Sequence, residues 1–230
     1  MSAQTAENPH SLPSGGALIA VALGLMVLAG VTAFLLLGTG GPIDGRARMV
    51  QAFGVADLPF ALQIASATKM SSGGELVVYE TPGAPVEPAR PEPEGTAKGV
   101  AVSRVDWSKV EIPEASGAPR QASFLFVPGE RGRSVLEEMI REVRGKDRTE
   151  LDDKGGTVLV GRGKLDFRGW DSDWIHLRTY EPGGTFRDAM RISLSTPEDP
   201  CVLTATWPRG TPAAREQLEE LVKPLVAKPR

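Results

Sequence analysis

The chain has 230 residues, of which 26 are lysine or arginine and 29 are aspartate or glutamate. The resulting net charge of −3 provides none of the basic surface that a nucleic acid partner requires, so we expect no nucleic acid binding. The single cysteine, Cys201, excludes a framework of internal disulfides and does not distinguish between compartments.

An apolar run over residues 17–37 contains no charged and no amide side chain. A helix of this length spans roughly 31 Å, which matches the hydrocarbon thickness of a bilayer. Residues 1–16 contain no lysine or arginine, and the run is about twice as long as the apolar region of a cleaved signal peptide. We therefore expect a polar tail at 1–16 and a retained, single-pass transmembrane helix at 17–37.

The flanks of this run leave the membrane side of the rest of the chain undetermined. Arg46 and Arg48 follow it, and the positive-inside rule weakly favours a cytoplasmic location for what comes after. Small residues recur every four positions at Gly16, Ala20 and Gly24. This spacing is compatible with a homodimer through close helix packing, but the general abundance of small residues in membrane helices is the slightly favoured explanation.

A proline- and glutamate-rich stretch at 81–98 is the main internal boundary. Proline has no amide hydrogen and biases its neighbours towards extended backbone, so this stretch is predicted to be a tether or a loop. It separates a short unit at 46–80 from an α+β domain at 99–228. In the first unit, Phe60–Met70 and Glu75–Glu80 flank a Ser-Ser-Gly-Gly turn, which predicts a β-hairpin that packs on or near the main domain.

The main domain begins with segments rich in β-branched and aromatic residues, which predict strands at 99–105, 107–112 and 123–127. A helix follows, because Ser134 and Glu137 have the spacing of a capping box and Gly145 stands just after the apolar repeat. We expect this helix to lie on a sheet with its charged side in solvent.

Residues 157–207 alternate between apolar and polar side chains, which predicts four antiparallel strands that each have one face in water. Thr211 and Pro212 then predict the start of a final helix. The expected fold class is thus α+β: a single N-terminal transmembrane helix, followed by a domain with one antiparallel sheet covered by two helices.

The candidate binding residues lie on the predicted polar face of the sheet and are Trp174, His176, Arg178, Tyr180 and Arg191. Aromatic and cationic side chains on an open face are typical of contact with another macromolecule. The favoured function is a membrane-tethered, non-catalytic binding or assembly module for an unknown protein or envelope partner. No cofactor is expected.

The alternative function is a membrane-anchored hydrolase that uses His176 with Ser193 or Ser195 and a carboxylate such as Asp188. These residue types can form a nucleophile, base and orienting acid. The serines lie on an alternating strand and not in a sharp G-x-S-x-G elbow, so catalysis is the less favoured hypothesis.

Asp171 and Asp173 form a D-x-D pattern that could hold a cation. The same residues are common in tight turns, and a turn is expected between the strands that end near Phe167 and start near Trp174. A turn is the favoured interpretation, and no metal is expected.

Overall fold

The computed structural model describes residues 39–71, 73–83, 112–114, 117–129, 132–141, 143, 151, 155–181, 184–194 and 199–226. The chain divides into two compact units, 1–37 and 38–230, and all described residues belong to the second unit. Residues 17–37, Gly16, the stretch 84–98 and the expected strands at 99–105 and 107–111 lie outside the described residues. Among the helices that are described, none has the length and apolar character needed to cross a membrane.

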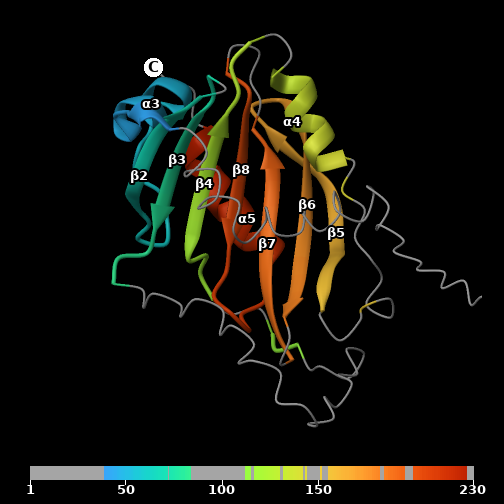
Figure 1. Ribbon diagram of the computed structural model, residues 1–230. Coiled ribbons are helices and arrows are strands. Elements are labelled where there is room, and N and C mark those ends of the chain that lie inside the picture. Colours follow the sequence, from blue (N-terminus) through green and yellow to red (C-terminus); the bar gives the residue numbers. More distant parts are fainter. Residues whose placement is uncertain are drawn as a thin grey trace, which may run out of the picture. The chain divides into compact units, whose positions relative to one another are not determined.

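The described part of the chain is built on one sheet of eight antiparallel strands (Figure 1). The strands are β1 (Thr39–Pro42), β2 (Gln63–Met70), β3 (Glu75–Glu80), β4 (Gln121–Phe126), β5 (Gly156–Phe167), β6 (Trp170–Glu181), β7 (Thr185–Ser193) and β8 (Cys201–Thr206). Their spatial order is β1-β2-β3-β4-β8-β7-β6-β5. The predicted hairpin is formed by β2 and β3, and it continues the sheet because β3 also pairs with β4.

Three α-helices accompany this sheet: α3 (Gly45–Phe53), α4 (Gly132–Arg141) and α5 (Arg215–Val222). A 3-10 turn, η3 (Lys223–Val226), extends α5. In Figure 1, α4 and α5 lie on opposite sides of the sheet. The expected fold class is corrected in two respects. The described residues contain three helices and not two, and they contain no helix that could span a membrane.

Helix α3 was missed because it lies within a stretch that was assigned to the hairpin unit. Its start is set by Asp44, whose carboxylate accepts a hydrogen bond from Ala47 N at 3.0 Å. Its end is set by Gly54, which adopts the left-handed conformation with φ of 77°. Its buried residues are Gly45, Met49, Ala52 and Phe53, of which only Met49 and Phe53 have large apolar side chains, so the helical signal in the sequence is weak.

The face of the sheet that carries α3 and α5, here called the α5 face, holds the larger core. Phe124, Leu203 and Ile192 stand side by side on β4, β8 and β7, and all three are fully buried. Phe53 of α3 and Leu221 of α5 belong to the same cluster. Burial of such side chains contributes about 1.5–3 kcal/mol each to folding.

The opposite face, here called the α4 face, is also covered. Helix α4 contacts β6, β7 and β8 and buries Leu136 and Ile140. Ile175 and Leu177 of β6 are buried on this side. Successive side chains of these strands therefore pack against different layers on the two faces of the sheet. The prediction that every strand has one face in water is wrong for the centre of the sheet.

Helix α4 begins two residues before the predicted capping box, so Ser134 lies inside the helix and is exposed. Gly132 permits this start, because a Cβ at that position would stand 2.1 Å from the carbonyl oxygen of Val127. Helix α5 begins after the predicted Thr211 and Pro212, where Ala214 N donates to Gln217 Oε1 at 3.0 Å.

Candidate functional site

The predicted binding residues are divided between the two faces of the sheet. Trp174 and His176 stand opposite Ile192 and Met190 of β7, so the even-numbered residues of β6 point to the α5 face. Arg191 stands opposite Ile175 and points to the α4 face. The five residues Trp174, His176, Arg178, Tyr180 and Arg191 therefore do not form a single open surface.

His176 and Arg178 are buried, with 7% and 5% of their surface exposed, and both contact the fully buried Asp188 of β7. Asp188 Oδ1 accepts from Arg178 Nε at 2.6 Å, and Oδ2 accepts from Arg178 Nη2 at 2.7 Å. His176 Nε2 lies 2.8 Å from Oδ2. The backbone N–H of Ala213, just before α5, also donates to Oδ2 at 2.8 Å. This buried charge cluster links β6, β7 and the start of α5.

The charges in this cluster stabilise one another. Burial alone would raise the pKa of Asp188, but the hydrogen bonds from Arg178, His176 and Ala213 outweigh it and lower that pKa. Burial would also lower the pKa of Arg178, whereas its bonds to Asp188 raise it. Asp188 is thus an anion that is held by hydrogen bonds from three residues, and the cluster is a structural link between layers.

The hydrolase hypothesis requires a serine beside His176. Ser193 of β7 stands opposite Val202, which places it on the α4 face, while His176 lies on the α5 face. The other candidate, Ser195, lies outside the described residues. The structure thus brings His176 together with Asp188 and places the sheet between His176 and Ser193.

Asp171 and Asp173 are part of strand β6 and not of a turn. The turn before them consists of Arg168 and Gly169, both with positive φ (56° and 81°), as in a two-residue hairpin turn of type I′. Asp171 Oδ2 lies 3.0 Å from Lys164 Nζ, and Asp173 Oδ2 accepts from Arg141 Nε at 2.8 Å. In the part of the chain that the structure describes, no three potential metal ligands come together.

Strand β5 has 12 residues and lies at one end of the sheet. Among the described residues, β5 pairs with β6 along one side and with no strand along the other. A bulge interrupts the register between Leu159 and Gly161. After the bulge, Gly163 and Leu165 point to the α5 face, whereas Lys164 and Asp166 are exposed on the α4 face.

Trp174 covers the glycines of this strand. A Cβ added to Gly163 would stand 3.1 Å from atoms of the indole ring, and one added to Gly161 would stand 3.6 Å from it. An aromatic ring that packs on glycines of an edge strand compensates for their missing side chains. Trp174 therefore supports β5, and sequence reasoning placed it instead in a binding surface.

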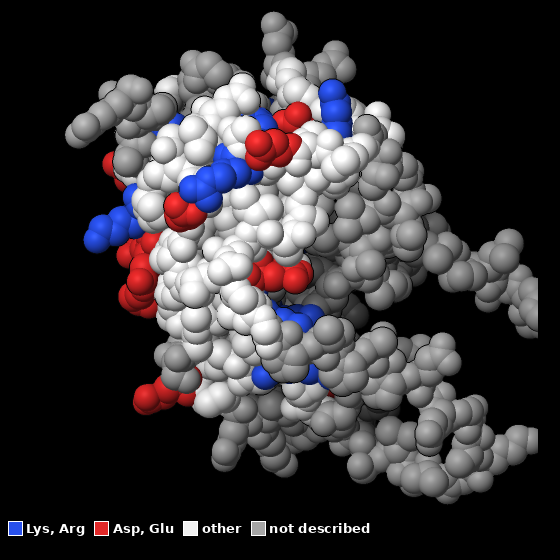
Figure 2. Space-filling model, turned by 90° about the vertical axis from the view of Figure 1, so that its left-hand side faces the viewer, with Lys and Arg blue, Asp and Glu red and all other residues white. Residues whose placement is uncertain are grey.

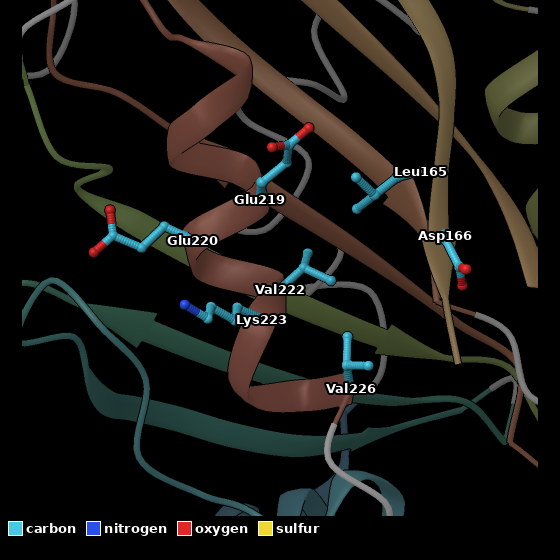
Figure 3. A pocket seen from close by; sticks show the side chains of 7 residues that line it. All are labelled: Leu165, Asp166, Glu219, Glu220, Val222, Lys223 and Val226. Carbon is cyan, nitrogen blue, oxygen red and sulfur yellow. The ribbon is translucent and has the colours of Figure 1, made fainter. Parts of the chain in front are cut away.

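A groove of about 570 Å³ lies between β5 and the helical segment formed by α5 and η3 (Figure 3). In Figure 3, Leu165 points from β5 towards the helix, and Val222 and Val226 point from the helix into the same gap. Charged residues border the remainder of the groove: Glu219, Glu220 and Lys223 from the helical segment, and Asp166 of β5, whose side chain lies on the α4 face. The sequence contained no signal for this groove, because its two walls come together only in the folded chain.

Arg168 connects the two walls at the turn between β5 and β6. Its Nε donates to the carbonyl oxygen of Leu225 in η3 at 3.1 Å. Its two Nη atoms donate to the carbonyl oxygens of Ala52 and Phe53, at the C-terminal end of α3. Such carbonyls are left unpaired by the helix and attract cations, so Arg168 holds η3 and α3 at the tip of the hairpin.

Figure 2 shows one face of the molecule, on which basic and acidic side chains lie next to each other among uncharged residues. The signs of charge are mixed on this face. Elsewhere in the described residues, Arg46 and Asp57 form an exposed ion pair at 3.1 Å.

No family model matches this chain, and no curated protein matches it. A crystal structure of a protein of unknown function from Pseudomonas aeruginosa, described as a putative regulator, shares 18% identity with the chain. The match covers 41% of this chain and 65% of that chain, with a TM-score of 0.21. A likeness of this size supports no conclusion about fold or function.

Proposed function

We propose that the protein is a non-catalytic binding or assembly module, whose partner adds an extended segment to the open edge of β5. The observation that carries this proposal is the pairing of β5 along one side only among the described residues, over a strand of 12 residues. An edge strand presents a row of unpaired backbone N–H and C=O groups, which another extended chain can use.

The opposite end of the sheet is a poorer acceptor. Strand β1 has only four residues, its pairing with β2 is irregular between Thr39 and Gly41, and it ends at Pro42. Short length, irregular pairing and proline are the features that protect sheet edges from further pairing. The contrast between the two ends of the sheet favours β5 as the strand that accepts an extended segment of the partner.

The hydrolase alternative has less support. The carboxylate that contacts His176 also accepts hydrogen bonds from Arg178 and from the backbone before α5, which makes it a structural anchor. Ser193 lies across the sheet from that histidine.

The first test is amide hydrogen exchange, measured residue by residue by NMR on the full chain. In an edge strand, successive N–H groups alternate between the neighbouring strand and the open side. We expect slow and fast exchange to alternate between Gly161 and Phe167. Uniformly slow exchange would contradict the proposal, because it would mean that the outer side of β5 is already paired.

A matched pair of variants extends this test. Lys164→Pro and Leu165→Pro each remove one N–H, and one of these two N–H groups points to β6 while the other points outward. We expect the variant that lacks the outward-pointing N–H to keep its unfolding temperature within about 2 °C of the parent, since edge strands tolerate proline at such positions.

Ten-residue peptides that are selected from a random library for binding to the parent chain provide a further test. They should protect the fast-exchanging amides of β5, and they should not bind the variant that lacks the outward-pointing N–H. Protection confined to another strand would contradict the proposal.

A further inference from the structure

The exposed part of β5 has a sequence that is complementary to itself in one antiparallel register. In a twofold-symmetric pair of antiparallel strands, directly opposite residues share a face of the sheet. Because faces alternate along β5, one residue must then stand opposite its own copy. Each possible central residue defines a different register, and the charges of the strand distinguish between these registers.

Centring the pair on Leu165 places Lys164 of each chain opposite Asp166 of the other. Centring it on Gly163 would instead place Arg162 opposite Lys164, and centring it on Lys164 would place two lysines together. Opposite charges in directly facing positions stabilise a sheet, and like charges destabilise it. Lys164 and Asp166 are both exposed on the α4 face, so a second strand can reach their side chains. In the monomer, Lys164 Nζ lies 3.0 Å from Asp171 Oδ2, and this exposed pair would be shared with, or replaced by, the contact to Asp166 of the second chain.

The α5 face provides the apolar part of the same contact. A second strand would lie about 4.8 Å from β5, so its Leu165 would stand beside the first Leu165. That position borders the groove, where Val226 is 37% exposed. The paired leucines would therefore cover apolar surface that the monomer leaves in contact with water.

Resting on the proposed function of β5, we infer that its partner is a second copy of this chain, paired antiparallel and centred on Leu165. Two ion pairs, Lys164 to Asp166 in both directions, set the register, and the two Leu165 side chains pack together at the border of the groove between β5 and η3. The result is a closed twofold dimer in which the two sheets continue into each other.

A charge-swap series tests the register. Lys164→Asp makes both positions acidic and Asp166→Lys makes both basic, so each single variant places like charges opposite one another in the dimer. The double variant restores opposite charges in the reverse order. Glu138→Lys, at an exposed position of α4 away from β5, is the matched control.

The measurement is sedimentation equilibrium of the full chain in a mild detergent, which keeps the apolar stretch 17–37 in solution. We expect the parent, the control and the double variant to dimerise, and each single variant to dimerise more weakly by roughly tenfold or more. An equimolar mixture of the two single variants should recover the dimer as a mixed species. Thermal unfolding of each variant verifies that the monomer is intact.

A dimer that persists unchanged in both single variants would overturn the inference, because the contact would then lie elsewhere. A parent chain that stays monomeric would also overturn it. If selected peptides still protect the amides of β5 in that case, the proposed function stands and only the identity of the partner is wrong. If they do not, the proposed function fails as well.

Discussion

Strands β7 and β5 flank β6 on its two sides, and both carry charged side chains, yet these charges have opposite environments. Asp188 of β7 is fully buried and its carboxylate receives hydrogen bonds from three residues. Lys164 and Asp171, at the junction of β5 and β6, form an ion pair with 62% and 71% of their side chains exposed. A period of two identifies which residues share a face, but it does not reveal whether that face is open.

The contrast predicts that the buried carboxylate matters far more for stability than the exposed one. Asp188→Ala should lower the free energy of unfolding by about 3–5 kcal/mol, because it leaves Arg178 buried without its counter-ion. Asp171→Ala should lower it by only about 0.2–1 kcal/mol. Urea unfolding of both variants provides the comparison. Similar losses in the two would mean that the buried cluster is not the link it is inferred to be.

Apolar residues of the helical segment α5–η3 should likewise contribute more to stability in the core than at the groove. Leu221 is fully buried, so Leu221→Ala should cost about 2–5 kcal/mol of unfolding free energy. Val226 lines the groove and is 37% exposed, so Val226→Ala should cost about 0.5 kcal/mol or less. Thermal unfolding distinguishes these outcomes, and a large loss for Val226→Ala would show that the groove is closed in solution.

The buried cluster also predicts a dependence on pH. The pKa of Asp188 is lowered in the folded state, so its contribution to stability is complete above the unfolded-state value of about 3.9. That contribution is lost as the pH falls from there through the lowered pKa of the folded state. Asp188→Asn should therefore reduce the slope of unfolding free energy against pH below about pH 4. An unchanged slope would assign the acid sensitivity to other carboxylates.

The smallest expected effect on stability is the difference between alanine substitutions at two glycines of β5. Gly161→Ala should be tolerated, or stabilise by about 0.4–1 kcal/mol, since its Cβ would meet the Trp174 ring at an ordinary 3.6 Å. Gly163→Ala should show no such stabilisation, because its Cβ would stand 3.1 Å from the ring and the indole would have to move. The difference in unfolding temperature between the two variants measures how firmly Trp174 supports the edge. Equal temperatures would show that the indole moves freely.

The local elements could be predicted from the sequence because their signals are local. The Ser-Ser-Gly-Gly turn lies between β2 and β3, and the alternation over 157–207 corresponds to β5, β6, β7 and β8. The apolar repeat after Ser134 corresponds to α4. Turn chemistry and side-chain periodicity act within a few residues, so a single chain is sufficient to detect them.

The candidate site depended on contacts between distant segments. The sequence predicted that His176 and Arg178 face solvent, but both are buried against Asp188, which also accepts a hydrogen bond from Ala213 N in the segment before α5. The edge position of β5 follows from the order of strands in the sheet, and the groove follows from the approach of η3 to that edge. Composition and periodicity thus determined the strands and the faces their residues share. Only the tertiary structure decided which face is buried and which edge lacks a neighbouring strand among the described residues, because burial depends on what the rest of the chain places on top.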